Sequence, residues 1–134
     1  MANILILEDD NFINEDIKFF LEDRGHTCQI FDNADSVMKN LRILENYKLL
    51  VLDLMMMRGE FLKDDKSNLT TGELIFRKIK GLYPKLEIVI LTAMSSCDIK
   101  LSKNELNDIP VFIKPLDSKY RIDFLNVIDE RTKK

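Results

Sequence analysis

The residues of this chain that are best suited to chemistry stand at the ends of its short apolar runs. They comprise carboxylates, one hydroxyl and one ammonium group: Glu8, Asp9, Asp10, Asp53, Thr92 and Lys114. Carboxylates held close together repel one another, which makes it costly to ionise all of them unless a cation lies between them. Mg²⁺ relieves this repulsion, because it binds carboxylate, water and phosphate oxygens. With a lysine and a hydroxyl nearby, this set is typical of a site where a phosphoryl group is attached or transferred to a carboxylate.

Each of these residues alone also has an ordinary structural explanation. Asp9, Asp10 or Asn11 could simply cap the first helix, since acids that follow strands often have that role. A Lys-Pro pair after a strand, as at residues 114 and 115, is weak evidence by itself. The joint placement of four such features favours a functional cluster.

The apolar runs have the length of buried strands and alternate with amphipathic segments. The predicted strands span residues 3–7, 27–31, 49–54, 87–93 and 110–114. The predicted helices span residues 11–24, from 33 or 35 to 46, from 70 or 71 to 83, and 96–107; a last helix starts at 117 or 118 and contains Ile122, Leu125 and Ile128. This alternation predicts an α/β fold with a parallel sheet and helices on both faces. Because ligands of such sheets bind outside the carboxyl ends of the strands, the polar strand ends should share one pocket.

One connection departs from this rhythm. Between Asp53 and the next helix, residues 58–71 form a charged stretch that is longer than the usual βα loop. We expect a solvated, mobile flap there, and a partner-specific lid over the site is the alternative. No repeat or linker suggests a second domain, so residues 1–134 are expected to form a single domain.

The composition argues against several classes of function. The chain has 134 residues and a formal net charge of −3, without the basic patch that direct nucleic-acid binding requires. Cys28 and Cys97 lack the spacing of a metal site or a disulfide framework, and the single histidine, His26, is expected to be an exposed turn residue. No apolar run is long enough to cross a membrane or to act as a signal peptide. A cytoplasmic protein without membrane insertion is therefore expected.

Four motifs in this order resemble the receiver (CheY-like) domain of two-component response regulators: ILILEDD, LVLDLMM, VILTA and IKP. The resemblance extends from residue 3 to about residue 131. It implies a flavodoxin-like (βα)5 fold whose five-stranded parallel sheet has the strand order 2-1-3-4-5. It also predicts a stand-alone receiver domain without an effector domain.

The resemblance implies a role for each member of the acidic cluster. Asp53 matches the aspartate that accepts the phosphoryl group. Glu8 and Asp9 match the acidic pair that holds Mg²⁺, with Asp9 the more direct ligand. The backbone carbonyl of Met55 matches the third protein ligand of the metal. Mg²⁺ is thus the implied cofactor, bound by Glu8, Asp9, Asp53 and Met55.

The resemblance also implies a mechanism. The Asp53 carboxylate would attack a phosphohistidine of a histidine kinase or a histidine phosphotransfer protein. Lys114 matches the lysine that pairs with the phosphoryl oxygens, and Pro115 matches the proline that usually follows it through a cis bond. Thr92 matches the hydroxyl residue that reorients on activation and shifts a pre-existing equilibrium.

The implied role is that of a signalling phosphoacceptor rather than a turnover enzyme. Output would pass to an unknown downstream protein, without direct contact to nucleic acid. A dimer linked to phosphorylation is a further option.

Three positions depart from the family pattern. Val111 stands where the family has an aromatic residue coupled to activation, so the readout must use another element. Met57 replaces a frequent proline. Gly72 matches the glycine that opens the third helix, which leaves an insertion of roughly eleven residues within residues 58–71. Met55 and Met94 should flank the phosphoryl group and restrict water, which predicts a long-lived acyl phosphate.

Other functions fit parts of the sequence. A haloacid-dehalogenase-type phosphatase needs a second acid two residues after its aspartate, where this chain has Met55. A flavodoxin-like cofactor binder needs a phosphate-cradling loop near its start, and the chain has only 4 glycines. The strongest rival is a degenerate receiver that acts as a phosphorylation-independent docking module. The intact Asp53, Thr92 and Lys114 argue against it.

Overall fold

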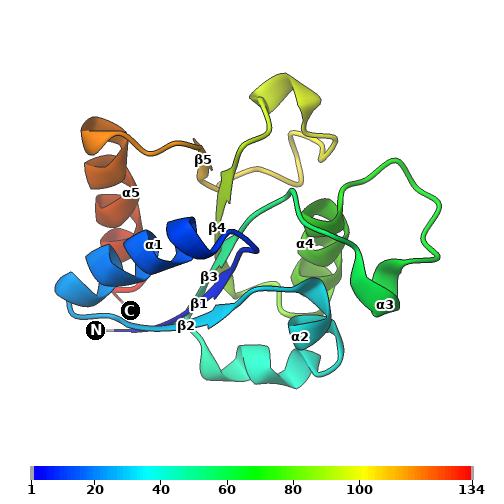
Figure 1. Ribbon diagram of the computed structural model, residues 1–134, viewed down its shortest axis with the longest axis horizontal. Helices are drawn as coiled ribbons and strands as arrows, with labels where there is room; N and C mark the ends of the chain where they lie inside the picture. Colours follow the sequence, from blue (N-terminus) through cyan, green and yellow to red (C-terminus); the bar gives the residue numbers. More distant parts are fainter. Residues whose placement is uncertain (1, 134) are drawn as a thin grey trace.

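The computed structural model of the chain describes residues 2–133, and its centre is a five-stranded parallel sheet (Figure 1). The strands are β1 (Asn3–Leu7), β2 (Thr27–Phe31), β3 (Leu49–Leu52), β4 (Glu87–Thr92) and β5 (Val111–Ile113), in the order β2-β1-β3-β4-β5. Every strand pair is parallel, so the carboxyl ends of the strands lie at one edge of the sheet. The predicted fold class and strand order are confirmed.

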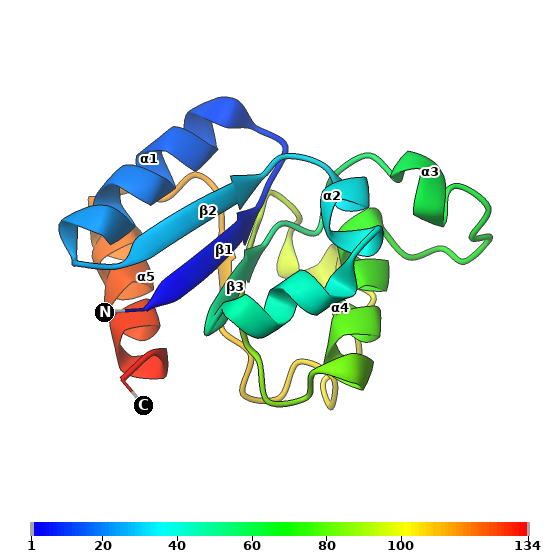
Figure 2. The same ribbon diagram turned by 90° about the horizontal axis from the view of Figure 1, so that it is seen from below.

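Helices cover both faces of this sheet (Figures 1 and 2). One face carries α1 (Asn11–Asp23) and α5 (Ser118–Arg131), and the other carries α2 (Ala34–Met38), the 3₁₀-helix η1 (Leu41–Asn46) and α4 (Thr71–Leu82). The short helices α3 (Gly59–Leu62) and η2 (Ser96–Asp98) lie in the connections after β3 and β4. Within residues 2–133, none of the helices combines the length and the apolar character needed to cross a membrane.

Alternate residues of β1 face the two helical layers. Ile4 and Ile6 pack in the cluster under α1 and α5, whereas Leu5 and Leu7 pack in the cluster under α2 and α4. All four side chains are fully buried. Because side chains alternate across a strand, a strand covered on both faces needs an unbroken apolar run.

Side-chain caps explain where three of the helices begin. Asp10 accepts hydrogen bonds from two backbone N–H groups in the first turn of α1, at 3.0 and 3.3 Å. Thr70 and Glu73 form a complete capping box at the start of α4, and Asp117 caps α5. Asp10 therefore has the structural role that was the alternative for the acids after the first strand.

The second predicted helix is shorter than expected. α2 ends at Met38, and η1 takes up the remaining residues to Asn46. Asn40 lies between them with φ −153°, outside the helical region. Asparagine competes for backbone hydrogen bonds and favours such breaks.

The predicted helix over residues 96–107 is wrong. Besides η2, the structure has only one turn there, and it begins at Ser102. Ser102 and Glu105 form a capping box, in which each side chain accepts from the other's backbone N–H at 3.1 and 2.9 Å. Asp108 then adopts φ 66°, and Pro110 precedes β5. The positive φ of Asp108 ends the turn that follows this late cap, and the proline beyond it cannot continue a helix.

His26 is not the exposed turn residue that was expected. It is 7% exposed, and its Nε2 lies 2.7 Å from Asp129 Oδ1 on α5, 103 residues further along the chain. Arg24 contacts the other oxygen of Asp129 at 2.5 Å. Burial alone would raise the pKa of Asp129, but the hydrogen bonds from His26 and Arg24 outweigh it and lower this pKa. The cluster ties the turn between α1 and β2 to α5.

Candidate functional site

The carboxyl ends of four strands bring the predicted site residues together. Glu8 follows β1, Asp53 follows β3, Thr92 ends β4 and Lys114 follows β5. The parallel register of these strands aligns their ends. Glu8, Asp53 and Thr92 are buried, and the Lys114 side chain is only 11% exposed. Two acids, a hydroxyl and an ammonium group therefore share one largely enclosed place.

The Asp53 carboxylate is buried but has partners on both oxygens. Its Oδ1 accepts from the backbone N–H of Met55 at 3.1 Å, and its Oδ2 accepts from the Lys114 ammonium at 3.2 Å. The backbone N–H of Asp53 donates to the carbonyl of Leu7 at 3.1 Å. These contacts fix the orientation of the carboxylate and balance its charge in a buried place.

Glu8 shares Lys114 with Asp53. The Glu8 carboxylate accepts from the Lys114 ammonium and, through its other oxygen, from the backbone N–H of Asp10 at 3.1 Å. Burial raises the pKa of Glu8 to about 7; the Lys114 hydrogen bond opposes this rise, and the nearby Asp53 charge adds to it. For Lys114, burial lowers the pKa, but the hydrogen bonds and charges of the two acids outweigh burial and raise it. Lys114 therefore stays cationic and links the two acids.

Three acids have the arrangement of a metal site. Carboxylate oxygens of Glu8, Asp9 and Asp53 lie within 4.8 Å of one another. Asp9 is exposed, so it can face a hydrated cation. The donors are oxygen atoms, which fits Mg²⁺. Met55 lies on the same loop as Asp53, and its backbone carbonyl as a metal ligand stays a prediction.

Thr92 is fully buried, and its hydroxyl is engaged by the connection after β4. Its Oγ1 accepts from the backbone N–H of Met94 at 3.3 Å, and its carbonyl accepts from the backbone N–H of Lys114 at 2.8 Å. The Lys114–Pro115 peptide bond is cis, as the resemblance implied. A rotation of the Thr92 side chain that moved its hydroxyl away from Met94 would release this N–H group.

Two hollows open beside the cluster. One, of about 640 Å³, lies between the connection after β3 and the connection after β4, and its lining includes Met55, Thr70, Glu73, Ala93, Met94 and Lys100. The other, of about 460 Å³, lies between α1 and α5 and reaches Lys114. Met55 and Met94 both line the first hollow, and that they flank a phosphoryl group on Asp53 stays a prediction. Their effect on the lifetime of an acyl phosphate stays a prediction.

Gly72 is required where the start of α4 meets the loop that carries Asp53. Its N–H donates to the carbonyl of Leu54 at 3.0 Å. A Cβ atom on Gly72 would lie 2.3 Å from the carbonyl oxygen of Asp53 and from the Cα of Leu54. Any side chain would displace the backbone of Asp53 itself, which is a steric reason for a glycine at this position.

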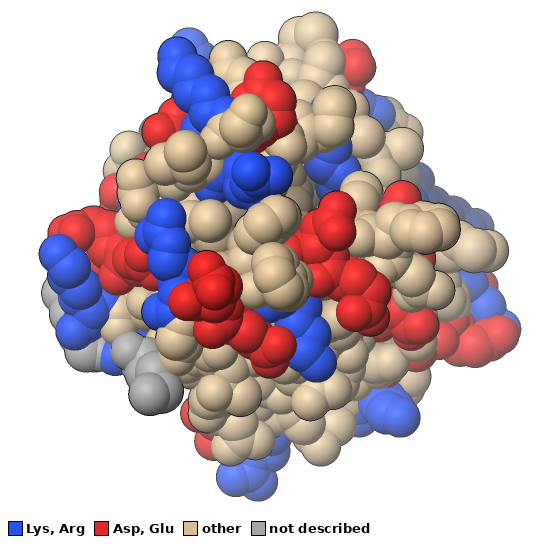
Figure 3. Space-filling model, turned by 60° about the vertical axis from the view of Figure 1, so that its left-hand side comes forward, with Lys and Arg blue, Asp and Glu red and all other residues tan. Residues whose placement is uncertain are grey.

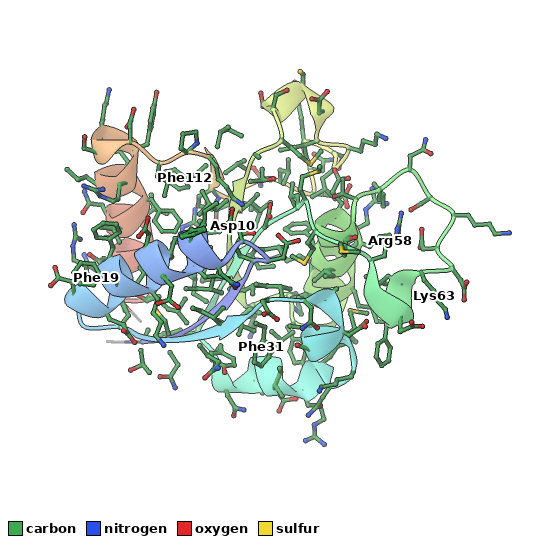
Figure 4. All side chains as sticks on the ribbon, in the orientation of Figure 1. Asp10, Phe19, Phe31, Arg58, Lys63 and Phe112 are labelled. Carbon is green, nitrogen blue, oxygen red and sulfur yellow. The ribbon has the colours of Figure 1, made fainter. Side chains whose placement is uncertain are left out.

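Residues 58–71, within which the resemblance predicts an insertion, project outward beyond α2 and α4 in both ribbon views (Figures 1 and 2), and we call them the inserted segment. Figure 4 shows Lys63, on this segment, well away from Asp10 at the start of α1. Asp35 of α2 accepts from the backbone N–H groups of residues 60 and 61 at 2.9 and 3.2 Å, and these bonds lower the pKa of Asp35. Arg58 donates to the carbonyl of Leu69 at 2.9 Å and closes the segment. The segment is largely exposed, as expected. Hydrogen bonds hold its first residues against α2 and join its two ends, and its mobility stays a prediction.

Two residues beside the first hollow, Glu73 and Lys100, were not among the site residues predicted from the sequence. Glu73 is fully buried, and its Oε2 accepts from the backbone N–H of Lys100 at 2.5 Å. The pattern Thr-x-x-Glu at residues 70–73 marks a capping box and could have indicated Glu73. Its contact with Lys100 joins two separate connections, and no local pattern indicates such a contact.

Charges of both signs are mixed on the face around α1 and α5 (Figure 3). On that face, acidic side chains gather in runs with basic side chains scattered between them, and the described residues form no continuous basic surface there. This pattern agrees with the net charge of −3 and does not favour nucleic-acid binding there.

No protein-family model matches this sequence, whereas solved structures of receiver domains resemble the fold over nearly the whole chain. A CheY-like response regulator receiver domain protein from Methanospirillum hungatei JF-1 has a TM-score of 0.71 and 22% identity, and the match covers 98% of this chain and 94% of that one. The BeF3-activated DrrB receiver domain has a TM-score of 0.72 and 21% identity over 100% of this chain and 99% of that one. TrrA from Thermotoga maritima, a response regulator protein in complex with Mg(2+)-BeF, has a TM-score of 0.67 and 23% identity over 93% and 99%. This chain therefore has the receiver fold.

Proposed function

We propose that this chain is a phosphoacceptor in a two-component phosphorelay and that Asp53 receives the phosphoryl group. One observation carries the proposal: the buried Asp53 carboxylate is held by Lys114 beside the carboxylates of Glu8 and Asp9. It lies at the carboxyl edge of a sheet with the receiver fold. This is the edge where parallel sheets bind their ligands.

The proposed reaction is in-line attack of an Asp53 carboxylate oxygen on the phosphorus atom of a phosphohistidine. The O–P bond forms as the P–N bond breaks, and the electron pair of that bond leaves with the donor imidazole. No general base is needed, because the carboxylate attacks as an anion. Lys114 is close enough to Asp53, at 3.2 Å, to balance charge on the transferred group.

Glu8, Asp9, Asp53 and the carbonyl of Met55 are the proposed ligands of Mg²⁺. When bound there, the ion supplies charge neutralisation for the phosphoryl oxygens. The oxygen-only donor set supports this choice of metal, and the similar structure of TrrA contains Mg(2+)-BeF.

Thr92 is the residue proposed to respond to phosphorylation. Its hydroxyl would release the N–H of Met94 and donate to a phosphoryl oxygen. That exchange frees the beginning of the connection after β4. Val111 on β5 is too small to report the change as an aromatic side chain could, so this connection is the proposed readout.

The proposed donor is a histidine kinase or a histidine phosphotransfer protein, and the proposed output is a protein whose contacts change with phosphorylation. In this role Asp53 carries the phosphoryl group as a signal, so the chain is not a turnover enzyme. A cytoplasmic location fits such a donor.

The test is incubation of the wild type, Asp53→Ala and Asp10→Asn with a small phosphoramidate and Mg²⁺, followed by mass spectrometry. Asp10→Asn is the matched control, because asparagine keeps the cap of α1 while removing a nearby charge. We expect one phosphoryl group on the wild type and on Asp10→Asn, and none on Asp53→Ala. Labelling of Asp53→Ala, or of no form at all, would refute the proposal; in the second case a docking module that works without phosphorylation becomes the better explanation.

A further inference from the structure

The buried carboxylate of Glu73 joins the two connections that flank Asp53. Glu73 is 0% exposed and lies in the first turn of α4. One oxygen accepts from the backbone N–H of Thr70, at the end of the inserted segment, at 2.8 Å. The other accepts from the backbone N–H of Lys100, in the connection after β4, at 2.5 Å. A single side chain of a helix therefore holds both connections.

Lys100 makes a second contact between the same two connections. Its ammonium donates to the carbonyl of Asn68 in the inserted segment at 3.0 Å. Lys100 thus binds α4 through its backbone and the inserted segment through its side chain. If Lys100 moves, both contacts are lost together.

A separate pair limits which part of the connection after β4 can move. Arg77 of α4 donates two hydrogen bonds to the Glu105 carboxylate, at 2.6 and 2.9 Å. Paired bonds of this kind between a guanidinium and a carboxylate are strong and directional. The pair holds residue 105 against α4, so residues 93–100, which precede it, are the part of the connection that our proposal takes to move.

Thr92 lies directly before that movable part. Its hydroxyl accepts from the backbone N–H of Met94, so a Thr92 that turns toward Asp53 releases Met94. Only the single turn η2 lies between Met94 and Lys100. The hollow of about 640 Å³ beside this stretch gives it room to shift.

We propose that the two contacts of Lys100, to Glu73 and to Asn68, form a latch that phosphorylation of Asp53 opens, which makes the inserted segment a second output element. This inference rests on the proposed function. In the unphosphorylated protein the latch holds the end of the inserted segment against the connection after β4. Once Thr92 turns inward, residues 93–100 shift, Lys100 leaves both partners, and residues 63–69 lose the tie that Lys100 gives them to the connection after β4.

The experiment is hydrogen exchange measured by NMR, with and without magnesium and beryllofluoride as a stable substitute for the phosphoryl group. The reporters are the backbone N–H groups of Ser67, Leu69 and Thr70, each of which donates a hydrogen bond within or beside the segment. In the wild type, beryllofluoride should speed their exchange about fivefold, the change expected when one hydrogen bond that holds the segment is lost. In Lys100→Met these groups should exchange fast without beryllofluoride and respond little to its addition.

Two control variants separate the latch from a general effect. Lys103→Met removes another exposed lysine of the same connection and should behave like the wild type. Asn68→Ala keeps the main-chain carbonyl that Lys100 binds, so it should also behave like the wild type. If Lys100→Met does not fold, Lys100→Gln takes its place in the same comparison.

Fluorine NMR of bound beryllofluoride, with Asp53→Ala as the reference, shows whether the site itself is loaded. Binding to the wild type without faster exchange at the three reporters overturns the latch and leaves the proposed function standing. Absence of Asp53-dependent binding overturns the proposed function and the latch with it. A control variant that mimics Lys100→Met also overturns the latch.

Discussion

Lys114 donates hydrogen bonds to two buried carboxylates, those of Glu8 and Asp53. Its ammonium contacts both Glu8 and Asp53, which are 2% and 3% exposed. A buried ion that lacks a full partner costs several kcal/mol, and one cation compensates two carboxylates only in part. Burial raises the pKa of Glu8 to about 7, and the nearby Asp53 charge adds to this rise. At the scale of single residues, the site is therefore prepared to gain a cation.

Gly72→Ala is expected to lower the free energy of unfolding by about 2–3 kcal/mol, because the added methyl group overlaps the backbone of Asp53 and Leu54. Urea unfolding measures the change. Gly81→Ala is the matched control on the same helix, since a Cβ there meets nothing within 4 Å and should stabilise by about 0.5–1 kcal/mol. Equal stability of the two variants would contradict the steric role of Gly72.

At the scale of elements, α4 organises the connections on either side of it. Its first turn binds Thr70 and Lys100 through Glu73, and its exposed side binds Glu105 through Arg77. The connection after β4 satisfies part of its polar groups through these contacts rather than through helical hydrogen bonds of its own. This explains how an irregular stretch can replace a helix at this place in the fold.

Glu105→Gln is expected to destabilise the protein more near neutral pH than in acid. The Arg77 hydrogen bonds, helped by the backbone N–H of Ser102, lower the pKa of Glu105 to about 2 from its ordinary 4.5. A lowered carboxyl pKa stabilises the fold above the unfolded pKa, and this contribution is lost as the pH falls from about 4.5 to about 2. Because solvent screens this ion pair, we expect Glu105→Gln to lower the free energy of unfolding by about 1 kcal/mol at pH 6.

Urea unfolding of the wild type and Glu105→Gln at pH 6 and pH 3 measures this difference. Glu130→Gln is the control, because Glu130 pairs with Lys133 on the open surface, where both side chains are 71% exposed. Its substitution should change the stability by less than about 0.5 kcal/mol. A Glu105→Gln effect that is the same at both pH values would contradict the stabilising role of the Arg77–Glu105 ion pair.

In the molecule as a whole, the carboxyl edge of the sheet carries the candidate site, and the opposite edge carries a contact that stabilises the fold. The parallel strands send Glu8, Asp53 and Lys114 to one edge, where they form the site. At the other edge, His26 and Asp129 join the start of β2 to α5. The candidate site therefore lies at one edge of the sheet, and the contact between β2 and α5 lies at the other. A ligand that binds the site of the folded protein should stabilise the entire fold.

Magnesium is expected to raise the melting temperature of the wild type. At a concentration of about 100 times the dissociation constant, a ligand of the native state adds about 2.7 kcal/mol to the free energy of unfolding. Asp9→Asn should lose most of this gain, because Asp9 is the exposed member of the acidic cluster. Thermal melts with and without magnesium chloride measure the shift.

Asp10→Asn is the control for magnesium, since it removes a neighbouring charge but keeps an oxygen that can cap α1. It should retain the full magnesium response. A response of Asp9→Asn as large as that of the wild type would place the metal elsewhere.

The amino-acid sequence is enough to predict the fold class and the residues that meet at the carboxyl edge of the sheet. Both follow from local patterns, because an unbroken apolar run marks a strand buried on both faces, and parallel strands share one edge for their carboxyl ends. The order of the residues along the chain is therefore enough to place Asp53, Glu8 and Lys114 together. The resemblance to receiver domains pointed to Gly72, although only the packing of α4 shows why it has to be a glycine.

Contacts between residues far apart in the chain could be seen only in the tertiary structure. His26 is buried because α5 brings Asp129 to it, and Glu73 holds Lys100 because two connections meet at the start of α4. Such contacts join residues far apart in the chain, so no periodicity or spacing encodes them. The helix predicted over residues 96–107 was lost for the same reason: helical propensity is a weak preference, and contacts with α4 together with the late cap at Ser102 outweigh it.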